Sequence, residues 1–114
     1  MKKSEIKFVV ELDEQNVPEK ILWEADDKQN NGLSETSAIS LNLWDPGHKN
    51  TLRIDLWTKE LPVDEMKRFA IDTIGGMAQT ILSATGDEYM ATEMNSLAER
   101  MVKHLEHELR QQQG

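Results

Sequence analysis

Apolar and polar side chains alternate along residues 36–58, on either side of the segment Asp45-Pro46-Gly47. This alternation predicts a β-hairpin, with a turn in which Pro presets φ and Gly accepts the positive φ that often follows. Pairing the two runs about the turn gives one aliphatic face and one polar face. The aliphatic pairs are Leu43 with Leu52, Leu41 with Ile54 and Ile39 with Leu56, and the other face pairs Trp44 with Thr51, Asn42 with Arg53, Ser40 with Asp55 and Ala38 with Trp57. A slip of one residue would turn the aliphatic face to water, so the pattern predicts this register.

The chain before the hairpin predicts one strand, one short helix and one loop. Residues 5–12 alternate as a strand with Ile6, Phe8, Val10 and Leu12 on one side, and its neighbour and direction stay open. Asn16 and Glu19 have the spacing of a capping box, which predicts a short helix from about Val17 to Ala25. Residues 26–35 are polar and without periodicity, as in a loop.

The chain after the hairpin repeats its apolar residues at helical spacing and predicts two helices. The first starts near Pro62 and stops near Thr85-Gly86, and the second starts with a capping box of Thr85 and Glu88 and reaches about Arg110. Gly75-Gly76 interrupts the first helix, either for close packing or a kink, or for a ligand that approaches the bare backbone.

The resulting order is β-α-β-β-α-α. We expect an α+β fold with a small three-stranded sheet, the hairpin 36–58 at its centre, and the two C-terminal helices packed on one face. All 114 residues are expected to form one domain, with a disordered polar tail at about 111–114. The last helix would be about 36 Å long, which is more than such a sheet covers. Its surplus apolar stripe predicts a homo-oligomer, most simply a dimer through the last two helices.

Charge and composition exclude several classes of partner. The net charge is −8, with 21 acidic and 13 basic residues, and the bases form no cluster. Phosphate backbones and anionic lipids repel such a chain, so we expect neither nucleic-acid binding nor membrane insertion. The absence of Cys, of a signal-peptide apolar segment and of a membrane-spanning run predicts a cytoplasmic protein.

The chain offers little catalytic chemistry. It contains neither a phosphate-binding glycine loop nor a nucleophile elbow, and its paired acidic residues fall at helix starts or in a loop. His104, His107 and Glu108 could form a weak metal clip, but they lie beside a fraying terminus and match no zinc motif. We therefore predict no enzyme, with no catalytic, cofactor-binding or metal-binding residues, and keep a metal-binding protein as a remote alternative.

Tryptophan and the long apolar stripe of the last helix mark a candidate interaction surface. Trp is often an interface anchor, although a helix, a loop or a second subunit could instead cover these indoles. The methionines could form plain core or an adaptable groove. The candidate residues are Trp44, Trp57, Met94, Met101, Leu105 and Leu109.

Three stretches resemble the gliding-motility protein GldC family: KKSEIKFVVELDEQNVPEKILWEADD, SLNLWDPGHKNTLRIDLWTKELPVDEMKRF and TIGGMAQT. The resemblance covers nearly the whole chain and contains no catalytic signature. It implies a small accessory factor inside the cell, with no established enzymatic activity, that supports surface gliding through partners in the motility apparatus.

Two function hypotheses follow, besides the remote metal-binding alternative. The first is a non-enzymatic cytoplasmic accessory protein that acts through protein–protein interaction and self-association. The alternative is a chaperone-like binder of unfolded or exported client proteins, which would use an open apolar groove at Trp44 and Trp57.

Overall fold

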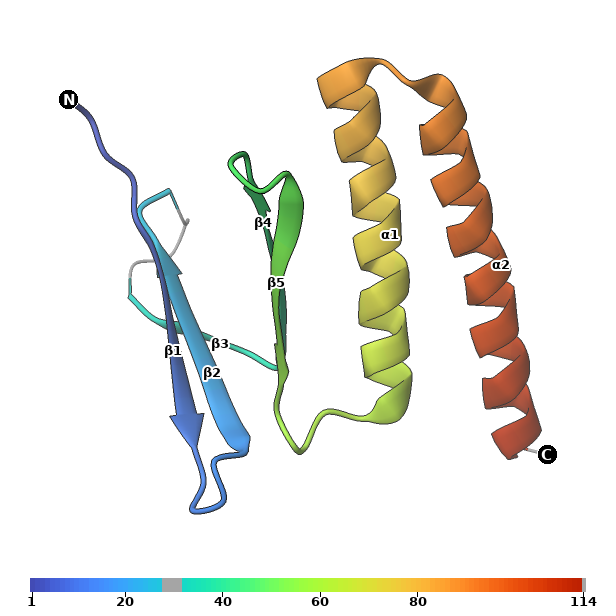
Figure 1. The fold of residues 1–114 in the computed structure, drawn as a ribbon. Helices are drawn as coiled ribbons and strands as arrows, with labels where there is room; N and C mark the ends of the chain where they lie inside the picture. Colours follow the sequence, from blue (N-terminus) through green and yellow to red (C-terminus); the bar gives the residue numbers. More distant parts are fainter. Residues whose placement is uncertain (28–31, 114) are drawn as a thin grey trace. The chain divides into compact units, whose positions relative to one another are not determined.

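The computed structural model describes residues 1–27 and 32–113, and the chain divides into two compact units (Figure 1). Residues 1–61 form the strand unit and residues 62–114 the helix unit. Five strands precede two helices, which confirms the α+β class. That the whole chain is one domain, and that the helices pack on one face of the sheet, stay predictions.

The strand unit contains two antiparallel sheets rather than the expected single sheet. Strands β1 (Ile6–Leu12), β2 (Pro18–Ala25) and β3 (Ser34–Thr36) form one sheet in the order β1-β2-β3. Strands β4 (Ala38–Asp45) and β5 (Asn50–Trp57) form a separate two-stranded hairpin. The sequence left the neighbour of the first strand open, and the structure places it antiparallel to β2.

The expected short helix at Val17–Ala25 is wrong, because this segment is strand β2. Asn16 has φ +65°, a left-handed conformation suited to a turn and not to a helix N-cap. The Asp13 carboxylate accepts hydrogen bonds from the backbone N–H groups of Gln15 and Val17, which closes the turn. Pro18 then opens the strand, a position where its missing N–H is tolerated. Pairing with β1 outweighs the local capping signal.

The hairpin has the predicted register in all seven pairs, from Ala38 with Trp57 to Trp44 with Thr51. Its turn differs in one detail. The residue with positive φ is Lys49, at +54°, and Gly47 does not take that conformation. Asp45 instead shapes the turn, since its Oδ1 accepts the Gly47 N–H at 2.9 Å and its carbonyl accepts the Lys49 N–H at 2.8 Å.

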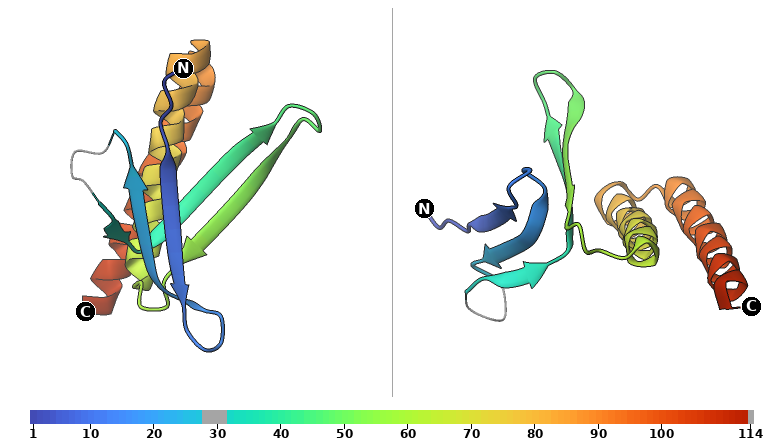
Figure 2. Two further views of the ribbon diagram at one scale, coloured as in Figure 1. Left: turned by 90° about the vertical axis from the view of Figure 1, so that its left-hand side faces the viewer. Right: turned by 90° about the horizontal axis from the view of Figure 1, so that it is seen from below.

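A bend at Ser37 joins the two sheets. β3 ends at Thr36 and β4 begins at Ala38, so one nearly continuous stretch of chain pairs first with β2 and then with β5. The hairpin consequently runs at an angle to β1 and β2 (Figure 2). Ser37 and Thr58 hold the base of the hairpin, where the Thr58 N–H donates to the Ser37 carbonyl at 3.0 Å.

The helix unit consists of α1 (Val63–Thr85) and α2 (Glu88–Gln113), antiparallel and joined by Gly86-Asp87 (Figure 1). Gly86 ends α1 with φ +74°, as a left-handed C-cap. The cap of α2 is Asp87 rather than the predicted Thr85, because Asp87 Oδ1 accepts the Met90 N–H at 3.0 Å. The helix continues through residues 111–113, which the sequence analysis assigned to the disordered tail.

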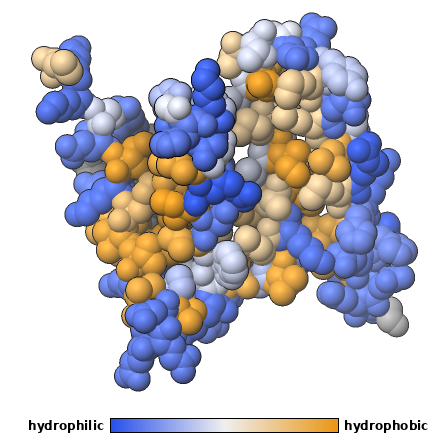
Figure 3. Space-filling model, viewed as in Figure 1, coloured by the Kyte–Doolittle hydropathy of each residue, from blue (hydrophilic) through white to orange (hydrophobic). Residues whose placement is uncertain are grey.

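Few side chains are fully buried. Among the described hydrophobic residues these are Ile21, Ile71, Ala78, Ala91 and Leu105. Many large hydrophobic side chains are at least two-fifths exposed, in both units. Hydrophobic residues accordingly gather on the surface over the strands and along the helix pair (Figure 3). Packing within the strand unit and within the helix unit therefore leaves a large apolar area open to water.

Candidate interaction surface

The hairpin exposes apolar side chains on both of its faces. On the aliphatic face Leu43, Leu52 and Ile54 are each about half exposed (50%, 51% and 48%). On the opposite face Trp44 is 64% and Trp57 52% exposed. A two-stranded hairpin is only marginally stable in water unless something packs on it. The hairpin is therefore the strongest candidate for a surface that binds another protein.

The two indoles lie at opposite ends of the same face. Trp57 pairs with Ala38 at the base of the hairpin, and Trp44 lies near its tip. Trp44 follows Ala38 by six positions along β4, which corresponds to about 20 Å. Polar residues occupy the face between them, including Arg53 and Asp55, which form an ion pair of 2.9 Å. The face thus offers two separate apolar anchors across a polar centre.

A shallow cavity of about 300 Å³ lies beside Trp57, within the strand unit. It is lined by Val17, Pro18, Asp55, Leu56, Trp57 and Lys59. The lining brings the start of β2 next to the end of β5, and the Lys59 N–H donates to the Pro18 carbonyl at 3.1 Å. The cavity could accept one apolar side chain of a partner beside the Trp57 indole.

Lys59 holds this corner of the strand unit by charge. Its Nζ lies 3.0 Å from Asp13 Oδ2 and 3.2 Å from Glu19 Oε1. Hydrogen bonds to Asp13 and then Glu19 raise the pKa of Lys59 above its usual value. The pKa of Asp13 is lowered, chiefly by the Val17 N–H and next by Lys59. These shifts belong to a structural ion-pair network at the β1–β2 turn.

The candidate residues of the last helix lie against α1. The seam between the helices, called the helix seam below, is formed by Ile71, Ile74, Ala78, Ile81, Ala91, Met94, Ala98, Met101 and Leu105, all buried or half-buried. Leu105, only 4% exposed, belongs to this packing and not to an open surface. Met94, Met101 and Leu109 are half-buried and keep part of their surface accessible.

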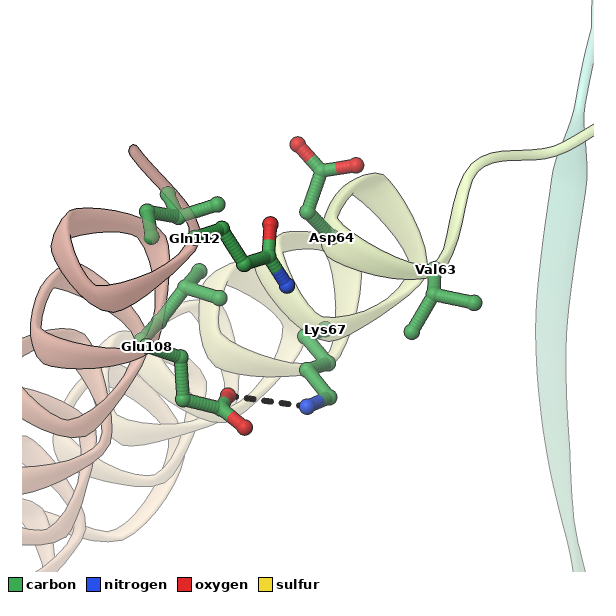
Figure 4. Close-up of a pocket in the computed structure, with 7 residues that line it drawn as sticks. Val63, Asp64, Lys67, Glu108 and Gln112 are labelled. Carbon is green, nitrogen blue, oxygen red and sulfur yellow. Dashed lines mark hydrogen bonds and ion pairs between the residues drawn. The ribbon is translucent and has the colours of Figure 1, made fainter. Parts of the chain in front are cut away.

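A polar cavity of about 130 Å³ lies between the start of α1 and the end of α2 (Figure 4). Lys67 Nζ donates to Glu108 Oε1 at 2.8 Å across it, and this hydrogen bond is the main cause of the lowered pKa of Glu108. Val63, Asp64 and Gln112 line the same cavity. The ion pair joins the start of α1 to the end of α2.

The candidate metal-binding residues of α2 are His104, His107 and Glu108. His104 Nε2 lies 3.5 Å from Glu108 Oε1, the oxygen that also accepts from Lys67. Residues 1–27 and 32–113 contain no group of three or more His, Asp or Glu side chains placed to hold a metal ion. Within those residues, neither helix has the length and apolar composition to span a membrane.

Comparison with known families decides what kind of protein this is. The family model of the gliding motility-associated protein GldC-like family matches residues 18–107. The chain belongs to the GldC-like family. The match begins with β2 and ends within α2, so both units of the GldC-like fold belong to it. It confirms the resemblance seen in the sequence. No curated protein and no solved structure shows significant similarity to the chain.

The sequence predicted which hairpin residues share a face, and left open whether the indoles are covered. It did not predict the half-exposed aliphatic face, and it missed two further features of the surface. One is the cavity beside Trp57, because the segment that starts at Pro18 was expected to be helical. The other is the second apolar strip of the helix pair, formed by residues such as Met77 and Leu97. The signal in the sequence was the recurrence of small or apolar residues every seven positions, which places them on one face of a helix.

Proposed function

We propose that this GldC-like chain is a non-enzymatic, cytoplasmic accessory protein of gliding motility that acts through contacts with protein partners and through self-association. The family supports the association with gliding motility. The observation that supports action by contact is the hairpin, whose two faces both carry half-exposed large apolar side chains. Large exposed apolar patches on a folded protein typically mark interaction sites.

The proposal that the chain is not an enzyme has support from its titratable groups. The shifted pKa values of Asp13, Asp45, Lys59 and Glu108 are each explained by hydrogen bonds that close a turn or join two elements. Structural ion pairs shift pKa values in this way without catalysis.

Gliding of living cells tests the proposed function. Cells that lack the protein would receive the wild-type chain or the double variant Trp44→Ala and Trp57→Ala. We expect the double variant to leave gliding at the level of cells without the protein, because both anchors of the binding face are gone. Tyr89→Ala is the matched control, since Tyr89 is an aromatic residue 74% exposed in the helix unit. Normal gliding by the double variant, at normal protein level, would contradict the role of the hairpin. Fractionation of the same cells checks the cytoplasmic location.

A second candidate function is chaperone-like binding of unfolded segments of other proteins. The aliphatic face of the hairpin favours it, because Leu43, Leu52 and Ile54 form a continuous half-exposed strip that could hold an extended apolar segment. The test is whether the protein slows the aggregation of an unfolding reporter protein, measured by light scattering. Slowing that survives Leu52→Ser together with Ile54→Ser would contradict binding at this strip.

A further inference from the structure

A second apolar strip runs along the helix pair, outside the helix seam. We call it the Met77–Leu97 strip. Its members are Ala70, Met77, Ala84, Met90, Leu97 and His104. In each helix they are seven residues apart, which is about two helical turns, so they share one face. Met77, Met90 and Leu97 are 42–44% exposed.

The cavity between the helices places both halves of the strip on the same side of the seam. Ala70 of α1 and His104 of α2 line one cavity of about 240 Å³, together with Lys67, Ile71, Met101 and Leu105. Lys67 of α1 contacts Glu108 of α2 at 2.8 Å, and in this antiparallel pair Met77 consequently lies level with Leu97 and Ala84 level with Met90. Leu82 and Val102 are similarly exposed but lie on the other side of the seam.

The accessible area is larger than the described packing explains. The chain exposes 9270 Å². A folded protein of this mass exposes about 6,400 Å², and two separately folded proteins of half the mass expose about 7,700 Å² together. The excess is therefore at least about 1,600 Å², and exposed hydrophobic side chains of both units contribute to it. The strip extends over about 21 Å of each helix, and with the adjoining side chains a face two helices wide and about 25 Å long offers about 500 Å², near the lower end for a specific interface.

The distribution of charge around the strip favours a second copy of the chain as its binding partner. Each chain carries a net charge of −8, so two copies repel unless they meet where charge is absent or paired. Residues 73–85 of α1 contain no charged side chain. On α2 the strip is bordered by exposed Glu93 and Arg100, and neither forms an ion pair with a residue in the described part of the chain. These two residues lie nearly symmetrically about Leu97.

We propose that two copies pack face to face through the Met77–Leu97 strip and form an antiparallel four-helix bundle. The two-fold axis runs at the level of Met77 and Leu97, perpendicular to the helices. α1 then faces α1 of the second copy and α2 faces α2. Leu97 meets Leu97, Met90 meets His104, and Glu93 pairs with Arg100 of the second copy twice across the axis. This inference rests on the self-association in the proposed function and assigns it to one face.

Disulfide trapping tests the position of the axis, because the chain contains no cysteine. A residue on a two-fold axis meets its own copy, so Leu97→Cys should cross-link into a covalent dimer under mild oxidation. Val102→Cys is the matched control on the other side of α2, and it should stay largely monomeric under the same conditions. Cross-linking of Val102→Cys in preference to Leu97→Cys would overturn the assignment of the face.

Sedimentation equilibrium tests the energetics of the same contact. We expect Leu97→Lys to raise the dimer dissociation constant by about 100-fold and Val102→Lys to raise it by less than about threefold. Glu93→Arg or Arg100→Glu alone should weaken the dimer by about tenfold, and the double swap should restore most of it, because the pair is re-formed with reversed charge.

The possible results distinguish failure of the proposed dimer face from failure of the proposed function. A wild-type chain that stays monomeric overturns self-association altogether but leaves the hairpin role, which is tested by gliding. A dimer that Leu97→Lys does not weaken overturns only the Met77–Leu97 strip. A monomeric wild type that Leu97→Lys destabilises, by circular dichroism at 222 nm, would assign the strip to the chain's own strand unit and overturn the bundle.

Discussion

At the scale of single residues, Asp13 accepts three hydrogen bonds through its carboxylate. Its Oδ1 accepts the N–H groups of Gln15 and Val17 at 2.8 and 3.0 Å, and its Oδ2 accepts from Lys59 Nζ at 3.0 Å. One carboxylate thus closes the β1–β2 turn and ties it to the residue that follows the hairpin. This arrangement replaces the predicted helix cap at Asn16, and it depends on Asp13 being ionised.

The pKa of Asp13 is lowered in the folded chain, so its contribution to stability is present above its unfolded pKa, roughly pH 4. That contribution is lost as the pH falls through the lower folded pKa. We expect wild-type strand-unit stability to fall more steeply below pH 4 than that of Asp13→Asn, which keeps an acceptor without the charge. Urea unfolding followed by tryptophan fluorescence measures this, because all three tryptophans lie in residues 1–61.

Asp72→Asn is the control for the acid-pH experiment, since Asp72 is an exposed carboxylate of α1. It should leave the pH profile of the strand unit unchanged. The stability contribution of Lys59 depends on pH in the opposite direction, because its pKa is raised in the folded chain. Its contribution is present below its usual pKa of about 10.4 and is lost as the pH rises through the higher folded value. Identical acid profiles for the wild type and Asp13→Asn would show that the ion pair adds nothing measurable.

At the scale of secondary-structure elements, the sequence predicted those with a strong and unopposed pattern. The hairpin register follows from its strict alternation, because a slip of one residue would have put aliphatic residues of one strand beside polar residues of the other. The helices begin and end close to the predicted residues because Pro62 and Gly86 are strong start and stop signals. β2 was missed because a local cap pattern competed with long-range pairing to β1, which a local pattern does not contain. The bend at Ser37 likewise depends on two different pairing partners.

The candidate site was predictable to the same extent. The structure places both indoles on the predicted face of the hairpin, whereas their exposure, which the sequence left open, is seen only in the structure. The apolar stripe of α2 was read as one surface, whereas the structure divides it into the helix seam and the Met77–Leu97 strip. That division depends on the rotation of α2 against α1, which the ion pair of Lys67 with Glu108 records and the periodicity of one helix does not.

Gly75 and Gly76 provide the prediction at the element scale. α1 is continuous through both glycines, and neither has a positive φ. Apart from the adjacent residues and the nearby backbone of α1, no heavy atom lies within 4 Å of a Cβ added at either position. Glycine in a helix interior costs about 1 kcal/mol relative to alanine. We therefore expect Gly75→Ala and Gly76→Ala each to stabilise the helix unit by about 0.5–1 kcal/mol. Thermal unfolding followed by circular dichroism at 222 nm measures the gain.

Gly86→Ala is the matched control for the glycine substitutions. Its surroundings are equally open, but its φ is +74°, where an alanine is strained. It should destabilise the helix unit, so the three variants separate backbone conformation from space. A loss of stability for Gly75→Ala or Gly76→Ala would show that another chain or a ligand packs on the bare backbone of α1, which is the alternative left open by the sequence.

At the scale of the whole molecule, we expect the stability of the folded chain to depend on dimer formation. Among residues 62–113, the buried hydrophobic side chains are Ile71, Ala78, Ala91 and Leu105, which is a small core for two long helices. Most helical stability in proteins comes from packing of an apolar face, so the Met77–Leu97 strip must contribute when it is covered. A chain that gains its packing from a second copy unfolds at a temperature that depends on its concentration.

We expect the midpoint of thermal unfolding of the wild-type protein to rise by about 2–4 °C for each tenfold increase in protein concentration. The reason is mass action, since higher concentration favours the dimer and only the dimer covers the strip. Leu97→Lys should unfold at a lower temperature that no longer depends on concentration, whereas Val102→Lys should keep the dependence. Circular dichroism at 222 nm over a hundredfold range of concentration measures all three. A wild-type midpoint that does not change over this range would mean that a single copy covers its own apolar surface, and the large area exposed by the two units would then have to close within one chain.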